Sequence, residues 1–247
     1  MTVVDEARAA ASLLTILPVG RREIPAGSEG GAALWFPLVG GLVGVLAAIA
    51  YGLGEALLGS LYGAAFALTV SAIVTGGLHH DGLADTADGL GVHGDLTRRL
   101  AAMRDSGIGA YGALALVAYA LLATAALARL SPPDAASALV CGHALGRWAA
   151  LAQLTFVAPA RADGLGAAFS AAMPAFALGS AVAVAITLVA AGFLAGLSAL
   201  AGAAIAAAAM ALLARRAVGG RTGDTLGAAV LVTELVVYSV LAAYLVT

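Results

Sequence analysis

The longest run without a charged residue, GLGAAFSAAMPAFALGSAVAVAITLVAAGFLAGLSALAGAAIAAAAMALLA at 164–214, decides the fold class. A helix that crosses a bilayer needs about 20 apolar residues, so these 51 positions can hold two crossings and a tight turn near 192–198. The alternative is a membrane barrel, whose strands alternate polar and apolar residues, and none of the apolar runs in this chain alternates. The sequence therefore predicts an all-α, polytopic integral membrane protein.

The composition of the whole chain supports the same class. Of its 247 residues, 62% are hydrophobic and 11% are charged, against about 25% charged in a soluble domain. The net charge of −2 gives no indication of a nucleic-acid partner. The single cysteine, Cys141, excludes an intramolecular disulfide and a metal site built from cysteines. No internal repeat or linker divides the sequence, so residues 1–247 are predicted to form one domain.

The apolar runs predict seven transmembrane helices after a short amphipathic helix. Segment 5–17 is expected to lie at the membrane interface and to end at Pro18. The spans are expected near residues 34–53, 58–78, 108–128, 136–157, 174–192, 197–214 and 226–246. The glycines of 40–44 and 192–202 are expected at close contacts between helices.

The arginines indicate how the chain is oriented. With the N-terminus in the cytoplasm of a bacterium, the inner segments hold ten arginines, the outer segments hold Arg129, and Arg147 lies within a span. This split follows the positive-inside rule and predicts a multi-pass protein of the cytoplasmic (inner) membrane. Residues 79–107 and 215–225 then lie on the cytoplasmic side, and 129–135 lies outside.

A cluster of aspartates follows the second predicted span, in HHDGLADTADGL at 79–90. Asp81, Asp85 and Asp88 are spaced i, i+4, i+7, which places them within an arc of roughly 60° on one helix face. Three carboxylates so close repel one another, and a divalent cation would reverse that repulsion. Mg²⁺ takes carboxylate oxygens and leaves positions for substrate phosphates, so the spacing indicates a Mg²⁺ site, with Mn²⁺ as an alternative ion. A solvated acidic helix end without a ligand is the other interpretation.

The order DGxxDxxDG stands within a longer motif, TGGLHHDGLADTADGLG at 75–91. Three further blocks accompany it: WFPLVGGLVG at 35–44, RRLAAMRDSGIGAYGALAL at 98–116 and GGRTGDTLGAAVLVTEL at 219–235. In order and content the four blocks resemble the cobalamin synthase family, the adenosylcobinamide-GDP ribazoletransferases. Ile16 and Gly107 depart from the family's pattern, since relatives often carry arginine at both positions.

This resemblance implies the final step of cobalamin assembly, carried out in the lipid bilayer. α-Ribazole, or its 5′-phosphate, is joined to adenosylcobinamide-GDP, and GMP is released. Such a phosphoryl transfer needs neutralised phosphate charge, in-line positioning and an acceptor for the hydroxyl proton. The aspartates would supply the metal site, and arginines would supply fixed cations for phosphate. Whether the protein works as a homo-oligomer is left open.

Further polar residues are expected in the site from their predicted positions and chemistry. We expect Asp81, Asp85 and Asp88 to hold the metal and Asp88, Asp224 and Arg104 to act in catalysis. The residues expected to bind substrate are Arg104, Asp105, Arg147, Arg221, Thr222 and His80. Structural roles are the alternatives: a surface ion pair for Arg104 and Asp105, a partnership with Glu234 for Arg147, and helix capping for Thr222 and Asp224. His79 and His143 are expected in structural or hydrogen-bonding roles, because Mg²⁺ prefers oxygen ligands.

The active site is expected to open to the cytoplasm, because a phosphate group cannot be carried far into hydrocarbon. We expect a polar hollow between the second, fourth and seventh spans, with Arg147 on its floor. Two other functional classes stay open. One is a membrane phosphotransferase of the CDP-alcohol type, whose aspartate spacing differs from DGxxDxxDG. The other is a proton-coupled transporter, which would place its carboxylates at mid-membrane depth.

Overall fold

The computed structural model describes residues 2–20, 29–162, 164, 167 and 169–245, and the regular elements in these ranges are helices. An isolated bridge between Pro159 and Arg221 joins two loops. The predicted all-α class is thus confirmed. The helices are α1 (Val3–Leu14), α2 (Glu29–Ala33), α3 (Phe36–Leu58), α4 (Ser60–Val74), α5 (Leu78–Gly91), α6 (Leu96–Ala102), α7 (Ala110–Ala128), α8 (Pro132–Phe156), α10 (Met173–Ala191), α11 (Phe193–Ala217) and α12 (Gly223–Leu245).

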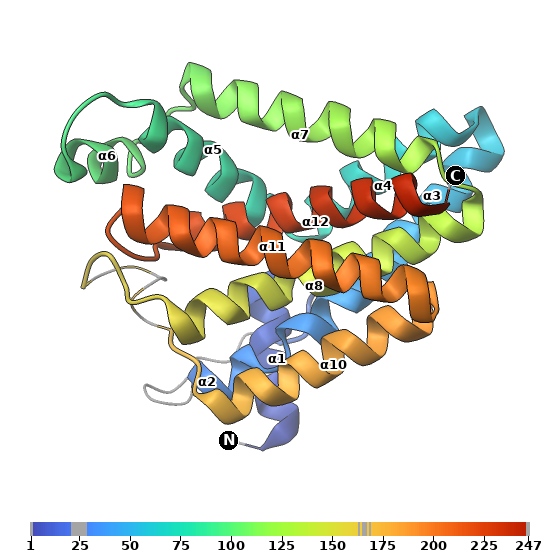
Figure 1. Cartoon of the computed structure of the whole chain (residues 1–247), viewed down its shortest axis with the longest axis horizontal. Coiled ribbons are helices and arrows are strands. Elements are labelled where there is room, and N and C mark those ends of the chain that lie inside the picture. Colours follow the sequence, from blue (N-terminus) through green and yellow to red (C-terminus); the bar gives the residue numbers. More distant parts are fainter. Residues whose placement is uncertain (1, 21–28, 163, 165–166, 168, 246–247) are drawn as a thin grey trace.

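The long helices form a bundle around α8, which packs against α3, α12 and α10 (Figure 1). Glycines bring α3 close to α8. A Cβ added to Gly40 would lie 2.2 Å from the His143 carbonyl oxygen, and one on Gly44 would lie 2.7 Å from the Leu139 carbonyl oxygen. Helices in membranes commonly pack through such small residues, and the close contact predicted for 40–44 is confirmed.

Five helices of the described chain are long and apolar enough to cross a membrane, and a sixth is added if the bent pair α4–α5 counts as one span. The five are Gly31–Leu58, α7, α10, α11 and α12. A polytopic membrane protein is therefore confirmed. α8 has 25 residues and runs along the bundle in Figure 1, but buried polar residues such as His143, Arg147 and Gln153 make it less apolar. The count of seven spans stays a prediction.

The second predicted span, 58–78, differs from the structure. α4 ends at Val74, and α5 leaves it at an angle of 94°. The break falls on Gly76 and Gly77, whose φ angles of 62° and 72° lie in the left-handed region that favours glycine. An uncharged run from 56 to 80 hides this bend, because no Asp, Glu, Lys or Arg marks where the helix stops.

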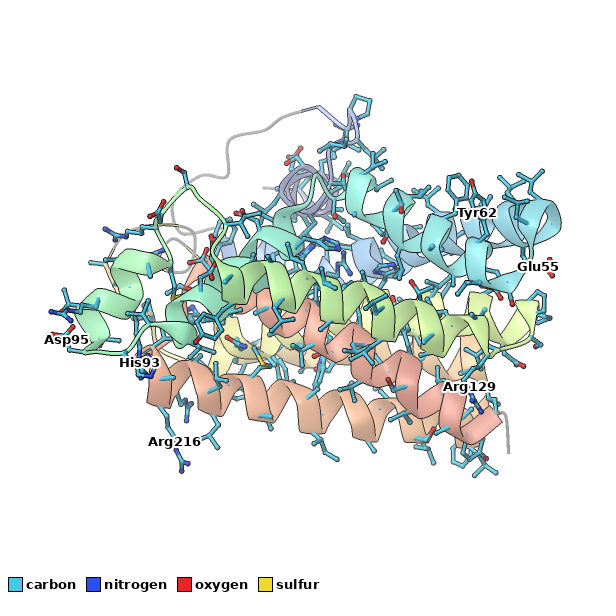
Figure 2. The ribbon with its side chains drawn as sticks, turned by 90° about the horizontal axis from the view of Figure 1, so that it is seen from above. Glu55, Tyr62, His93, Asp95, Arg129 and Arg216 are labelled. Atoms are coloured by element: carbon cyan, nitrogen blue, oxygen red, sulfur yellow. The ribbon has the colours of Figure 1, made fainter. Side chains whose placement is uncertain are left out.

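Two segments predicted to share one side of the membrane do lie at the same end of the bundle. Arg99 on α6 donates to the carbonyl of Ala217 over 3.0 Å, and a Cβ on Gly219 would lie 3.0 Å from Leu96. Figure 2 shows His93, Asp95 and Arg216 at this end and Glu55, Tyr62 and Arg129 at the opposite end. The structure confirms the pairing of 79–107 with 215–225, while the side that this end faces stays a prediction.

The predicted N-terminal helix is present as α1, and it runs across the direction of the long helices (Figure 1). Thr2 and Asp5 form a capping box at its start, and it ends before Pro18. Ala10 and Leu14 are buried in a cluster with Phe36 and other core residues, while Val3 is 64% exposed. α1 therefore has a core-facing side and an exposed apolar side, as an interfacial helix requires.

Candidate active site

The aspartates of α5 lie beyond the bend, and we place α5 outside the membrane-spanning helices because it carries three acidic residues in 14. Burial, followed by the charges of Asp81, Asp224 and Asp88, raises the pKa of the Asp85 carboxyl to about 6. The carboxylates are therefore close enough to repel one another, as their spacing predicts. A bound cation would relieve this repulsion.

Asp88 is turned toward the start of α7. Its Oδ2 accepts a hydrogen bond from the Gly109 N–H over 2.7 Å, and its Oδ1 accepts one from the Gly112 N–H over 2.9 Å. These N–H groups have no partner within the helix, so the carboxylate caps α7 and meets the positive end of its dipole. A Cβ on Gly112 would lie 2.4 Å from Asp88 Oδ2, which explains the glycine. The metal-binding and catalytic roles predicted for Asp88 would compete with this anchoring role.

The donor chemistry of α5 fits a hard cation, because carboxylate oxygens are the ligands that Mg²⁺ prefers. In the part of the chain that the structure describes, however, no group of three or more His, Cys, Asp or Glu side chains converges on a position for one ion. Asp88 accepts the N–H groups at the start of α7, and its metal-binding role stays a prediction. Mg²⁺ or Mn²⁺ remains a prediction, and oxygens from substrate would be needed to complete the ligand set.

Asp224 lies in the first turn of α12, where α12 crosses α5. Two glycines permit the crossing: a Cβ on Gly82 would lie 2.8 Å from the Asp224 carbonyl oxygen and 3.0 Å from the Gly227 Cα. The Asp224 carboxylate lies 3.6 Å from Nη2 of Arg161, in the loop after α8. It also interacts electrostatically with Asp81. The structure therefore brings Asp224 to the aspartates of α5, as predicted.

Arg221 and Thr222, the two residues before α12, are occupied by structural contacts. The Arg221 guanidinium is buried and donates to the carbonyls of Val157 and, over 2.6 Å, Phe169. Thr222 Oγ1 accepts the Thr225 N–H over 3.1 Å, so Thr222 caps α12. Capping is the alternative that the sequence left open for Thr222. In this geometry Arg221 holds Val157 and Phe169 beside the start of α12, and its substrate-binding role stays a prediction.

Arg104 and Arg161 line a common hollow of about 420 Å³. Its remaining wall is formed by Thr97, Leu100 and Ala101 on or beside the same turn of α6. Arg104 is exposed, and the Arg161 side chain is 19% exposed where it meets Asp224. Asp105 is exposed nearby and accepts the Gly107 N–H over 3.0 Å, closing a turn before α7. The hollow therefore presents two guanidinium groups beside a carboxylate of the candidate site.

Arg147 belongs to a buried polar cluster beneath α5. Its guanidinium donates to Glu234 Oε1, and His143 Nδ1 lies 2.8 Å from the same oxygen. Tyr119 donates to Glu234 Oε2 over 2.9 Å, and His79 Nδ1 lies 3.5 Å from Arg147 Nη2. Arg147 is 2% exposed and Glu234 is 1% exposed. The partnership with Glu234, left open from the sequence, is thus the arrangement found, and Arg147 does not line an open hollow.

A large cavity lies elsewhere than the hollow predicted from the sequence. It has a volume of about 730 Å³ and lies between the end of α1, the α4–α5 bend and the start of α7. His80 and Asp81 line it on α5, and the ring of His80 also contacts that of Tyr119 edge-on at 5.6 Å between centroids. Between α5, α8 and α12, where the hollow was predicted, the structure has a small and mainly apolar cavity of about 60 Å³, and Arg147 is not among the residues that line it. The bend at Gly76–Gly77 opens the large cavity on the other side of α5.

Comparison with known proteins shows the family of this chain. The family model described as cobalamin-5-phosphate synthase matches residues 6–242. The chain belongs to this family. Adenosylcobinamide-GDP ribazoletransferase of Bradyrhizobium diazoefficiens is 40% identical over 98% of this chain and 95% of its own length. The proteins of the same name from Azorhizobium caulinodans and Shewanella piezotolerans are 41% and 36% identical over 78% and 89% of this chain, and over 76% and 87% of their own lengths. No solved structure matches the chain.

Membership of the cobalamin synthase family confirms the resemblance seen in the four sequence blocks. Three polar contacts in the structure were not predicted from the sequence. Arg161 lies outside the quoted blocks, and the sequence indicated only that its charge is cytoplasmic. Tyr119 is in an apolar run, where nothing marks it as the partner of Glu234. The anchoring of Asp88 had one available signal, the glycines of GIGAYG at 107–112, which indicate close approach of another group at the start of α7.

Proposed function

We propose that this chain joins α-ribazole, or its 5′-phosphate, to adenosylcobinamide-GDP and releases GMP. The family match over residues 6–242 carries the proposal, and relatives alike over most of their length bear the name of this activity. The site supports it, because carboxylates and arginines meet at one end of the bundle. Phosphoryl transfer consists largely of positioning and electrostatic stabilisation, which such groups supply.

In the proposed reaction, a ribose hydroxyl oxygen that is free in both α-ribazole and its 5′-phosphate forms a bond to the phosphorus next to cobinamide. The bond from that phosphorus to the bridging oxygen of the diphosphate breaks, and GMP leaves with that oxygen. Asp224 is the better candidate to accept the hydroxyl proton, since both oxygens of Asp88 already accept backbone N–H groups. Arg104 interacts electrostatically with Asp224 and is suited to hold phosphate oxygens.

Mg²⁺ is part of the proposal, with Asp81 and Asp85 as the residues that would hold it. When bound, the ion would neutralise charge on the phosphate oxygens. The residues themselves position α5: Gly82 lets α5 touch α12, and Asp88 fixes α5 to the start of α7. These contacts hold two carboxylates of α5 near Asp224.

The location of the site is also a proposal. We place the end that carries α5, α6 and the start of α12 in the cytoplasm of the bacterial inner membrane. The distribution of arginines supports this orientation. The substrate partners would then reach the site without crossing the bilayer.

The decisive experiment measures GMP release by the purified protein from adenosylcobinamide-GDP and α-ribazole, with and without Mg²⁺. We expect release that requires the ion, and we expect Asp81→Ala and Asp85→Ala each to abolish it while the protein still inserts and purifies. Glu55→Ala, at the opposite end of the bundle, is the control for loss of an acidic side chain. Release at the wild-type rate after chelation, or in both aspartate variants, would contradict the proposed site.

A further inference from the structure

The carboxylates of the candidate site lie between two hollows of opposite character. On one side, Arg104 and Arg161 line a space of about 420 Å³, and Arg161 reaches Asp224 over 3.6 Å. On the other side, Asp81 lines the cavity of about 730 Å³. Asp224 interacts electrostatically with residues of both hollows: with Asp81, which lines the larger one, and with Arg104 and Arg161, which line the smaller one.

We propose that these hollows are separate subsites for the two substrates: Arg161 and Arg104 bind the diphosphate of the nucleotide donor, and the 730 Å³ cavity binds the α-ribazole nucleoside. This inference rests on the proposed function. It assigns a substrate-binding role to Arg161 and a location to the acceptor.

The arginine-lined hollow has the chemistry of a diphosphate site. Two guanidinium groups give fixed, bidentate donors that match phosphate oxygens. Arg161 already meets one anion, the Asp224 carboxylate, at a distance longer than a good charge-assisted hydrogen bond. A diphosphate that entered this hollow would be drawn to Arg161 and would lie beside Asp224, where the hydroxyl proton is to be accepted.

The larger cavity has the chemistry of a nucleoside site. Its volume lies within the range of about 300–1,000 Å³ for small-molecule pockets. Ile16, Leu17, Ile108 and Leu116 offer apolar walls for a flat aromatic base. His80 and Asp81 offer hydrogen-bonding groups for ribose hydroxyls at the side nearest the other carboxylates. The Asp81 carboxylate in its wall would repel an anionic group, so a neutral nucleoside suits this cavity better than the charged donor.

Substitutions in the two hollows should separate the two Michaelis constants. Arg161→Gln should raise KM for adenosylcobinamide-GDP by about tenfold to one-hundredfold, the range of one charge-assisted hydrogen bond. KM for α-ribazole should hardly change, and Arg161→Lys should recover part of the loss. Arg104→Gln, at an exposed position, gives a second test of the same subsite. Arg216→Gln, an exposed arginine at the same end of the bundle, is the matched control.

The opposite pattern is expected when the larger cavity is narrowed. Ile16→Trp and Ile108→Trp enlarge side chains that are 64% and 63% exposed, so neither change should disturb the core. Each should raise KM for α-ribazole several-fold and leave KM for adenosylcobinamide-GDP close to the wild-type value. Leu114→Trp is the control, because Leu114 is 66% exposed on α7 and does not line the cavity.

Equilibrium binding separates failure of the subsites from failure of the proposed function. GDP alone should bind the detergent-solubilised protein and lose affinity in Arg161→Gln, while α-ribazole should lose affinity in Ile108→Trp. A wild-type protein that releases no GMP contradicts the proposed reaction, but these two binding measurements still test the subsites. If Arg161→Gln alters neither GDP binding nor KM for the donor, or if both classes of variant raise the same KM, the two-subsite assignment is overturned.

Discussion

Replacing Arg147 by methionine tests whether the buried cluster under α5 holds the bundle together or binds substrate. The change keeps a long side chain but removes the cation that faces Glu234. Glu234 would keep the Tyr119 hydroxyl and His143 as partners, while its charge would lose the guanidinium. Removing one member of a buried ion pair costs about 3–5 kcal/mol, because the remaining charge stays buried.

The expected loss can be compared with that of a weaker partner in the same cluster. A hydrogen bond between helices in a membrane contributes about 0.6 kcal/mol on average and at most about 1.7, so Tyr119→Phe should cost far less than Arg147→Met. For a chain of this size, 1 kcal/mol lowers Tm by about 2–4 °C. Arg147→Met should therefore melt roughly 6–20 °C below the wild type, and Tyr119→Phe within about 7 °C of it.

The assay is thermal unfolding in detergent, combined with the steady-state constants of the same preparations. The double variant Arg147→Met/Glu234→Met should regain much of the lost stability, because replacing both members of a buried pair by apolar residues is often neutral. Arg216→Met, at an exposed arginine, is the control. If Arg147→Met melts within about 2 °C of the wild type and instead raises KM for adenosylcobinamide-GDP, Arg147 binds substrate and the structural interpretation fails.

Three further outcomes follow from other features of the bundle. Gly112→Ala should cost about 1–3 kcal/mol and lower turnover, because the new methyl group displaces the carboxylate that caps α7; Gly52→Ala, which meets no atom within 4 Å, should do neither. In a cysteine-free background, cysteines at Asp95 and Arg129 should react with an impermeant thiol reagent from opposite sides of the membrane, and labelling of position 95 from outside would reverse the proposed orientation. The pKa of the Asp85 carboxyl is about 6 in the folded protein against an ordinary 3.8, so folding favours the protonated carboxyl. The stability that this preference contributes is fully present below about pH 4 and is lost as the pH rises through 6. In thermal shift without divalent cations, Asp85→Asn should therefore be more stable than the wild type above pH 6 and equal to it near pH 4, whereas an equal difference at both values would exclude this titration.

The sequence predicts the helices and the two ends of the bundle well, because both depend on local signals. Uncharged runs of sufficient length mark the long helices, and the arginine split places 79–107 beside 215–225, which the contact of Arg99 with Ala217 confirms. The bend after Val74 escapes the same reasoning. A helix that turns by 94° through Gly76 and Gly77 keeps an uninterrupted apolar run, and hydropathy registers length but not direction.

The site is predicted less completely, because its contacts join residues far apart in the chain. Helical spacing places Asp81, Asp85 and Asp88 on one face, but it cannot show that the start of α7 occupies Asp88. The pairing of Arg147 with Glu234 crosses 87 residues. From the sequence, the pairing with Glu234 could be predicted only as an alternative to a substrate-binding role for Arg147. Local sequence does not mark Arg161 as a site residue, and only the fold shows that the loop after α8 places it beside Asp224.

The charged groups of this chain divide into two sets, and the division separates structure from function. At depth, the Glu234 carboxylate has Arg147, His143 and Tyr119 as partners, so its charge is compensated within the protein. At the end of the bundle that carries α5 and α6, burial and then the neighbouring carboxylates raise the pKa of the Asp85 carboxyl, so its charge is not compensated there. Carboxylates that oppose one another in this way suit a bound divalent cation, which would relieve the repulsion and would in turn bind a phosphorylated substrate. We therefore place the transfer reaction at this end and not at Arg147.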